Sequence, residues 1–140
     1  MIYGPADLYV VEFPRGVAPA QVTATLRAAT SAGVITLMDI ALIRIDSAGN
    51  RAVFELAEFA DEFGLVGVHP QAPGMIGTDD VEVLTEELPA GDTALVVLIE
   101  NTWARKIVQA VAESGARVRP VERFTADVVN EVAELAEFAD

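Results

Sequence analysis

The chain has 140 residues, of which 52% are hydrophobic and 22% charged, a composition typical of a folded globular domain and not of a disordered chain. Its formal net charge of −13 argues against nucleic-acid binding, which needs a basic face, and against anionic membrane surfaces. The chain contains no cysteine, which excludes disulfides, thiolate metal sites and cysteine nucleophiles.

The N-terminal part of the chain is predicted as strand, helix, strand. Residues 8–13 (LYVVEF) are apolar on both faces, as in a central strand. Residues 18–32 have the apolar spacing of a helix, and residues 34–45 form a long β-branched run. A turn over 46–50 then leads into a hairpin strand over 51–56. Asp46 is expected to open this turn through its side chain, and Gly49 can take a positive φ.

The middle of the chain is less regular. We expect a short helix over 57–63, a loop with four glycines and two prolines over 64–77, and a helix over 78–88. A second strand–helix–strand unit follows, with a strand over 93–99, a helix over 102–114 and a strand over 117–124. Pro120 within that last strand favours a position at a sheet edge. A C-terminal helix follows, with an apolar stripe formed by Val128, Val132, Leu135 and Ala139.

Two split βαβ units and a β-hairpin predict an α+β ferredoxin-like sandwich, with residues 1–140 as a single domain and a loop-rich insertion at about 57–91. Strands 8–13 and 93–99 are expected side by side in the centre of the sheet. Helices 18–32 and 102–114 would cover one face. The other face would be covered by the middle helix, the C-terminal helix or a second subunit.

The residues also carry a resemblance. The start GPADLYVVEFP at 4–14, the Met38-Asp39 step, the DSAGN turn and the ENTWA sequence at 100–104 resemble a family of small high-GC-bacterial proteins of unknown function. That family is similar to a second uncharacterised group with a long glycine-rich, membrane-inserting hairpin where this chain has only residues 64–77. The resemblance implies fold and bacterial origin. It implies no activity, cofactor or catalytic residue, and no membrane association.

No constellation of catalytic or metal-binding residues is recognisable. The single histidine, His69, cannot form a multi-histidine zinc site, and no nucleophile motif accompanies it. The glycines of 64–77 match neither GxGxxG nor a phosphate-binding loop. We therefore expect no catalytic residue, metal or cofactor.

Asp39 is the first candidate site residue, because its carboxylate falls inside the apolar run ITLMDIALI. Burying a carboxylate without partners costs several kcal/mol. One hypothesis places Asp39 at a strand bend, where it accepts backbone N–H groups. The other makes it a pocket acid with a raised pKa.

The second candidate is the polar sequence at the joint between strand 93–99 and helix 102–114, with Glu100, Asn101 and Trp103 as candidate binding residues. One interpretation is structural: Asn101 or Thr102 caps the helix, and Trp103 lies partly covered at the rim of the sheet. The other is a small-ligand or partner site that uses Trp103 as an anchor.

The sequence therefore favours a non-enzymatic cytoplasmic protein that acts by self-association or partner binding, with a homo-oligomer expected and with neither nucleic acid nor membrane as partner. The alternative is a small-molecule-binding protein or enzyme, with a pocket between the sheet and loop 64–77 that uses Asp39, Glu100 and Trp103. The sequence ELAEFAD, present at 55–61 and again at 134–140, reflects biased composition or two equivalent amphipathic segments.

Overall fold

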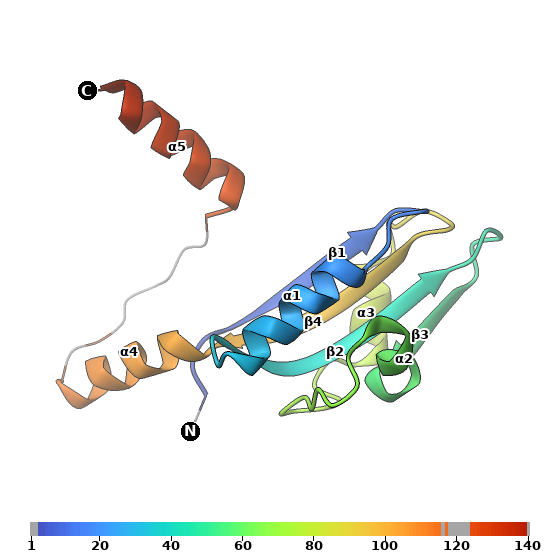
Figure 1. Ribbon diagram of the computed structural model, residues 1–140, viewed down its shortest axis with the longest axis horizontal. Coiled ribbons are helices and arrows are strands. Elements are labelled where there is room, and N and C mark those ends of the chain that lie inside the picture. Colours follow the sequence, from blue (N-terminus) through green and yellow to red (C-terminus); the bar gives the residue numbers. More distant parts are fainter. Residues whose placement is uncertain (1–2, 116, 118–123, 140) are drawn as a thin grey trace. The chain divides into compact units, whose positions relative to one another are not determined.

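The structure, a computed structural model, describes residues 3–115, 117 and 124–139. The described residues form four strands and five helices, and the chain divides into two compact units, Met1–Val108 and Gln109–Asp140 (Figure 1). The predicted α+β class is confirmed. The expectation of a single domain stays a prediction.

One antiparallel sheet organises the first unit, and its strand order is β1-β4-β2-β3. The strands are β1 (Ala6–Phe13), β2 (Ile35–Ile45), β3 (Arg51–Glu55) and β4 (Thr93–Asn101). Since β1 and β2 both run antiparallel to β4, they are parallel to each other with one strand between them. This is the split βαβ unit that the N-terminal sequence predicts.

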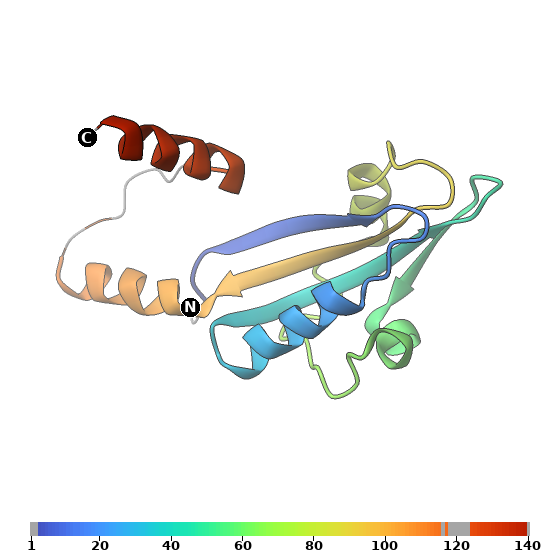
Figure 2. The same ribbon diagram turned by 45° about the horizontal axis from the view of Figure 1, so that its top comes forward.

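The strands expected over 8–13 and 93–99 lie side by side, as predicted, with Leu8 opposite Leu98 and Val10 opposite Val96. Their expected central position is confirmed for β4. Among the described residues β1 is an edge strand (Figure 2), and its central position stays a prediction because the strand expected over 117–124 lies largely outside them. The apolar run in β1 suggested burial on both faces. In the structure Leu8, Tyr9 and Val10 are 46%, 40% and 39% exposed, because no described element lies beyond β1.

One face of the sheet, called here the α1 face, is covered by α1 (Ala20–Ser31) and α2 (Leu56–Phe63). Its core combines large apolar side chains of the sheet with two phenylalanines of α2. The buried members of this core are Phe13, Leu37, Ile40, Leu42, Phe59, Phe63, Leu65, Leu95 and Val97.

The opposite face, called here the α3 face, is covered in part by α3 (Thr78–Leu84), which buries Val81 against Ala41, Ile43 and Val96. The middle helix is therefore one of the expected covers of this face. It ends four residues earlier than the predicted 78–88. The reason lies in Thr85–Leu88, where the chain makes a turn with a 3.1 Å backbone hydrogen bond.

The helix after β4, α4 (Thr102–Glu113), follows β4 without an intervening residue and buries none of its own residues. Trp103 and Ile107 are 57% and 55% exposed, so the expectation that helix 102–114 covers the sheet beside α1 is not met in this part of α4. A chain needs a turn to reverse its direction, and Asn101 leads directly into Thr102 with no residues for one.

The C-terminal part of the chain contains α5 (Ala126–Ala139). Val128, Val132 and Leu135 of its predicted apolar stripe are exposed. The predicted strand over 117–124 lies largely outside the described residues. None of the helices among the residues that the structure describes is long and apolar enough to cross a membrane.

The turn between β2 and β3 has the expected chemistry. The Asp46 carboxylate accepts hydrogen bonds from the backbone N–H groups of Ala48 at 2.9 Å and Asn50 at 2.8 Å. Gly49 has a φ of +88°, which residues with a side chain rarely adopt. The turn residues thus fix the β2–β3 hairpin.

Candidate functional site

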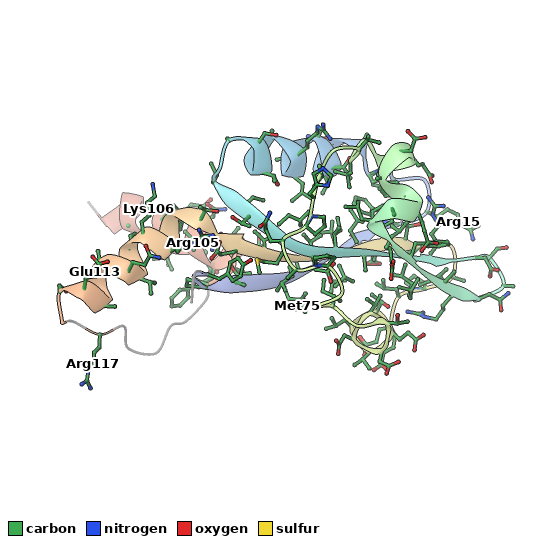
Figure 3. The ribbon with its side chains drawn as sticks, turned by 90° about the horizontal axis from the view of Figure 1, so that it is seen from below. Arg15, Met75, Arg105, Lys106, Glu113 and Arg117 are labelled. Atoms are coloured by element: carbon green, nitrogen blue, oxygen red, sulfur yellow. The ribbon has the colours of Figure 1, made fainter. Side chains whose placement is uncertain are left out.

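The carboxylate of Glu100 is the centre of a polar cluster at the end of β4. Glu100 is fully buried, on the α3 face, opposite Thr36 of β2 and Ala6 of β1. Arg105, one turn into α4, donates two hydrogen bonds to this carboxylate: Nε donates to Oε2 at 3.1 Å, and Nη2 donates to Oε1. The backbone N–H of Gly4 also donates to Oε2. Figure 3 shows Arg105 near the start of α4.

These contacts decide the charge state of the pair. The hydrogen bond from Arg105 lowers the pKa of the Glu100 carboxyl, against the opposing effect of burial, and the Gly4 N–H lowers it further. The same hydrogen bond raises the pKa of Arg105. The guanidinium also lies over the ring of Tyr3, 5.8 Å from its centroid. Glu100 is therefore an ionised, paired carboxylate, which is unsuited to act as an acid or a base.

A close approach of the backbone explains the glycine in this cluster. A Cβ added to Gly4 would lie 2.9 Å from the Cα of Arg105, closer than real Cβ atoms approach other atoms. Gly4 therefore lets the N-terminal segment reach the start of α4 and donate to Glu100.

The two residues that follow Glu100 tie further segments together. The Asn101 amide donates to Asp7 at 3.3 Å, and the Asn101 N–H donates to the carbonyl of Pro5 at 3.3 Å. The Thr102 hydroxyl lies 2.7 Å from that of Thr36, at the start of β2. The side chains of Asn101 and Thr102 thus join β4 to its two neighbouring strands.

Trp103 does not take part in this cluster. It is 57% exposed, more than the partly covered position that its place in the first turn of the helix led us to expect. Its neighbours along the same side of α4 include Ile107, which is also exposed. Trp103 therefore lies apart from the buried carboxylate of Glu100.

Asp39 lies elsewhere, at a β-bulge. The register between β2 and β4 shifts between Leu37 and Asp39, as the bend hypothesis predicts. Asp39 is 6% exposed, and its two carboxylate oxygens accept separate backbone N–H groups, from Ile40 at 2.9 Å and from Ile76 at 2.7 Å. This is the geometry of a structural carboxylate.

The bulge also holds the loop between α2 and α3. The carbonyls of Leu37 and Met38 accept hydrogen bonds from the N–H groups of Gln71 at 3.0 Å and Ala72 at 2.8 Å. β3 pairs only with the 41–45 part of β2, so this stretch of β2 is open to the loop. The loop thereby leads the chain from the α1 face to the α3 face, where Met75 lies (Figure 3).

A cavity of about 600 Å³ is present between the sheet and this loop, and it contains Asp39 and His69 among its lining residues. Glu100 and Trp103 do not line it. The four residues singled out from the sequence are therefore not brought together. Glu100 and Asn101 share the cluster at the end of β4, Asp39 lies beside the loop cavity, and Trp103 is exposed on α4.

Within the described part of the chain, the polar groups that are buried are also satisfied. No buried side-chain nitrogen or oxygen there lacks a hydrogen-bond partner. In the same residues, no group of three or more His, Asp or Glu side chains is arranged to hold a metal ion.

Sequence reasoning missed two features. The first is Arg105 as the partner of Glu100, which depends on the angle between β4 and α4. The second is an apolar groove of about 410 Å³ on the α1 face, between α1 and the outer strand β1, with Tyr9, Val11, Val22 and Leu26 among its lining residues. The sequence feature that could have indicated this groove is the run LYVV between Asp7 and Glu12, which contains no charged residue, proline or glycine.

Comparison with known proteins gives a family and no function. No curated protein and no solved structure matches the chain. A family model described as a family of unknown function, DUF6325, matches residues 2–139. The chain belongs to this family of unknown function.

Proposed function

We propose that this protein is a non-enzymatic cytoplasmic protein that acts by associating with further copies of itself through strand β1. The observation that carries the proposal is the exposure of β1. Leu8, Tyr9 and Val10 are consecutive, apolar or aromatic, and between 39% and 46% exposed. An exposed, apolar edge strand is a template for pairing with another strand.

Apolar surface continues from β1 onto both faces of the sheet. On the α1 face, the groove of about 410 Å³ lies between Tyr9 and Val11 of β1 and Val22 of α1. On the α3 face, Leu8 lines a second hollow together with Met75, Val83 and Leu84, all of which are exposed. Contiguous apolar surface of this kind is typical of interaction sites.

The other edge of the sheet provides an internal contrast. β3 has only five residues, and Arg51 and Glu55 stand at its two ends. β1 has eight residues, and its four central positions carry no charge. Short length and charge are the features by which proteins protect sheet edges, and β3 has both of them. The comparison supports β1 as the associating edge.

The state of the polar residues supports a role without catalysis. Glu100 is paired with Arg105, and Asp39 accepts two backbone N–H groups. A general acid or base needs a pKa near the working pH and a free face toward the substrate. Both carboxylates instead make hydrogen bonds that stabilise the fold.

The finer assignment of the fold is part of the proposal. The order of β1, α1 and β2, with β4 between the two strands, matches the first half of a ferredoxin-like sandwich and supports this assignment. The strand over 117–124, which would complete the second split unit, lies outside the described residues. Pairing of that segment with β1 is the arrangement that competes with self-association.

Size-exclusion chromatography coupled to light scattering tests the proposal. We expect a dimer or larger species at tens of micromolar, and a monomer for Val10→Lys, which places a charge on the exposed edge. Ala52→Lys is the matched control, because Ala52 is exposed on the opposite edge strand, and this variant should keep the wild-type mass. A wild-type chain that stays monomeric at these concentrations would overturn the proposal.

A second candidate function rests on the cavity between the sheet and loop 64–77, which contains Asp39 and His69. Its size is within the range of small-molecule sites. A thermal-shift screen of small metabolites would support this function if a compound raised the melting temperature of the wild type and not that of Ala41→Phe, which fills the cavity. A screen with no such compound would contradict it.

A further inference from the structure

The backbone groups of β1 that pair with no strand among the described residues follow a defined pattern. The N–H of Asn101 donates to the carbonyl of Pro5, so the backbone groups of residue 5 point toward β4. In an antiparallel pair this direction alternates along the strand. The backbone groups of residues 7, 9, 11 and 13 therefore point to β4, and those of Ala6, Leu8, Val10 and Glu12 point outward, where no described strand lies.

We propose that β1 pairs with β1 of a second copy, antiparallel and centred on Tyr9, and so joins two four-stranded sheets into one. This inference rests on the proposed self-association and specifies the edge, the partner and the register. The partner is a second copy because the outward-facing groups of β1 are complementary to themselves, as an interface with two-fold symmetry requires.

Symmetry limits the possible registers. A continuous antiparallel sheet places the two-fold axis perpendicular to the sheet, so each face of one copy continues into the same face of the other. Residues directly opposite each other then point to the same face. Odd-numbered residues such as Tyr9 and Val11 lie on the α1 face, and even-numbered residues such as Leu8 lie on the α3 face. An odd-numbered residue of one copy must therefore lie opposite an odd-numbered residue of the other, and an even-numbered residue opposite an even-numbered one.

Hydrogen bonding selects one register among these. With Tyr9 opposite Tyr9, Leu8 faces Val10 and Ala6 faces Glu12, so all outward-facing residues of β1 find a partner. A shift that centres the pair on Val10 sets Ala6 opposite Pro14, which has no N–H. A shift that centres it on Leu8 leaves Glu12 without a partner strand residue. An edge strand gains most when every outward group is bonded.

Charge and packing agree with the same register. Asp7 faces Val11, and Glu12 faces Ala6, so no two carboxylates are directly opposite in a chain with a net charge of −13. Leu8 and Val10 form two apolar cross-strand pairs on the α3 face. On the α1 face the grooves beside the two β1 strands meet at the Tyr9 pair. Both apolar surfaces that flank β1 become continuous across the axis.

The competing occupant of this edge is the segment 117–124 of the chain. It carries Arg117, Arg119 and Arg123, and Pro120 removes one N–H from any ladder that it forms. The β1 strand of a second copy has no proline between Ala6 and Phe13, and it offers an N–H at every outward position. The second copy is therefore the better match for the edge.

Single-cysteine variants test the register directly, because the chain has no cysteine of its own. In the proposed pairing Tyr9 faces its own copy as a non-hydrogen-bonded pair, with Cα atoms about 4.5 Å apart, which lies within disulfide range. Under mild oxidation Tyr9→Cys should form a covalent dimer. Val11→Cys and Asp7→Cys should each stay monomeric on a non-reducing gel, whereas their mixture should cross-link, since residues 7 and 11 face each other. Ala52→Cys on β3 controls for collisional cross-linking.

Each outcome decides between the two proposals. Cross-linking of Tyr9→Cys, together with cross-linking only in the Asp7→Cys and Val11→Cys mixture, would support the pairing. Light scattering that shows a dimer which Val10→Lys disrupts, without these cross-links, would leave self-association through β1 standing and overturn the antiparallel pairing centred on Tyr9. A monomer by light scattering that forms no cross-link would overturn both and would favour segment 117–124 as the occupant. If Val11→Cys, without Asp7→Cys present, formed disulfide-linked dimers as fast as Tyr9→Cys, the register centred on Tyr9 would be overturned.

Discussion

Glu100 and Arg105 form a carboxylate–guanidinium pair at the junction of β4 and α4, with Nε of Arg105 3.1 Å from Oε2 of Glu100. The carboxylate is fully buried, and the side chain of Arg105 is 28% exposed. The pair, together with the Gly4 N–H, fixes the N-terminal segment to the end of β4. Glu100, the first residue of the ENTWA sequence, therefore has a structural role.

The pair predicts a specific loss of stability. Arg105→Met removes the cation and leaves a buried carboxylate, which we expect to cost about 2–4 kcal/mol of unfolding free energy. Lys106→Met is the matched control, because Lys106 is adjacent and exposed, and it should change the free energy by less than about 0.5 kcal/mol. Urea titration of both variants measures the difference. Equal midpoints for the two variants would show that the pair adds nothing to the fold.

A pair of carboxylates, Glu12 and Asp92, predicts a pH effect. A hydrogen bond shared with Asp92 raises the pKa of Glu12, and burial and repulsion by Asp92 act in the same direction. Because the folded-state pKa is raised, this contribution to stability is fully present below the unfolded pKa of about 4.3 and is lost as pH rises through the folded value. Glu12→Gln donates to Asp92 at every pH. It should therefore be more stable than the wild type near neutral pH and lose that advantage in acid.

Denaturant midpoints from neutral pH down to below the ordinary glutamate pKa give the comparison. If the stability advantage of Glu12→Gln over the wild type grew in acid, the result would contradict a proton shared between Glu12 and Asp92.

Asp39 predicts an order among substitutions. Asp39→Asn keeps one acceptor and loses one of the two backbone hydrogen bonds, which should cost about 1–2 kcal/mol. Asp39→Leu leaves the N–H groups of Ile40 and Ile76 without that acceptor, so we expect it to cost more. Urea midpoints of both variants test this order. An Asp39→Leu protein as stable as the wild type would favour the pocket-acid hypothesis instead.

Trp103 is the only tryptophan and reports on the surface of α4. Since it is 57% exposed, its emission should be red-shifted and readily quenched by acrylamide. Trp103→Ala should cost less than about 1 kcal/mol, as is usual for an exposed side chain. Emission that is blue-shifted and resists quenching would show that another part of the protein covers this residue.

Much of the fold follows from local sequence. Apolar runs and turn residues located β1, β2, β4 and α1 within a few positions, and the chemistry of the Asp46 turn fixed the hairpin to β3. These features depend on neighbours along the chain, which a sequence displays directly.

Other features depend on how the elements are arranged in space, and the sequence alone did not settle them. The apolar run of β1 predicts burial, but whether a strand lies on its outer side depends on the rest of the sheet. The pairing of Glu100 with Arg105 required the geometry of a strand that leads straight into a helix. For Asp39 the sequence left two hypotheses open, because the donor Ile76 lies 37 positions away.

Residue-resolved amide hydrogen exchange, measured as a function of protein concentration, tests the association of β1 strands most directly. Self-association through β1 predicts that the outward-facing N–H groups of Leu8 and Val10 exchange slowly at high concentration and rapidly on dilution. The N–H groups of Tyr9 and Val11 point to β4 and should be protected at every concentration. Exchange of the Leu8 and Val10 N–H groups that is rapid at all concentrations would contradict self-association through β1.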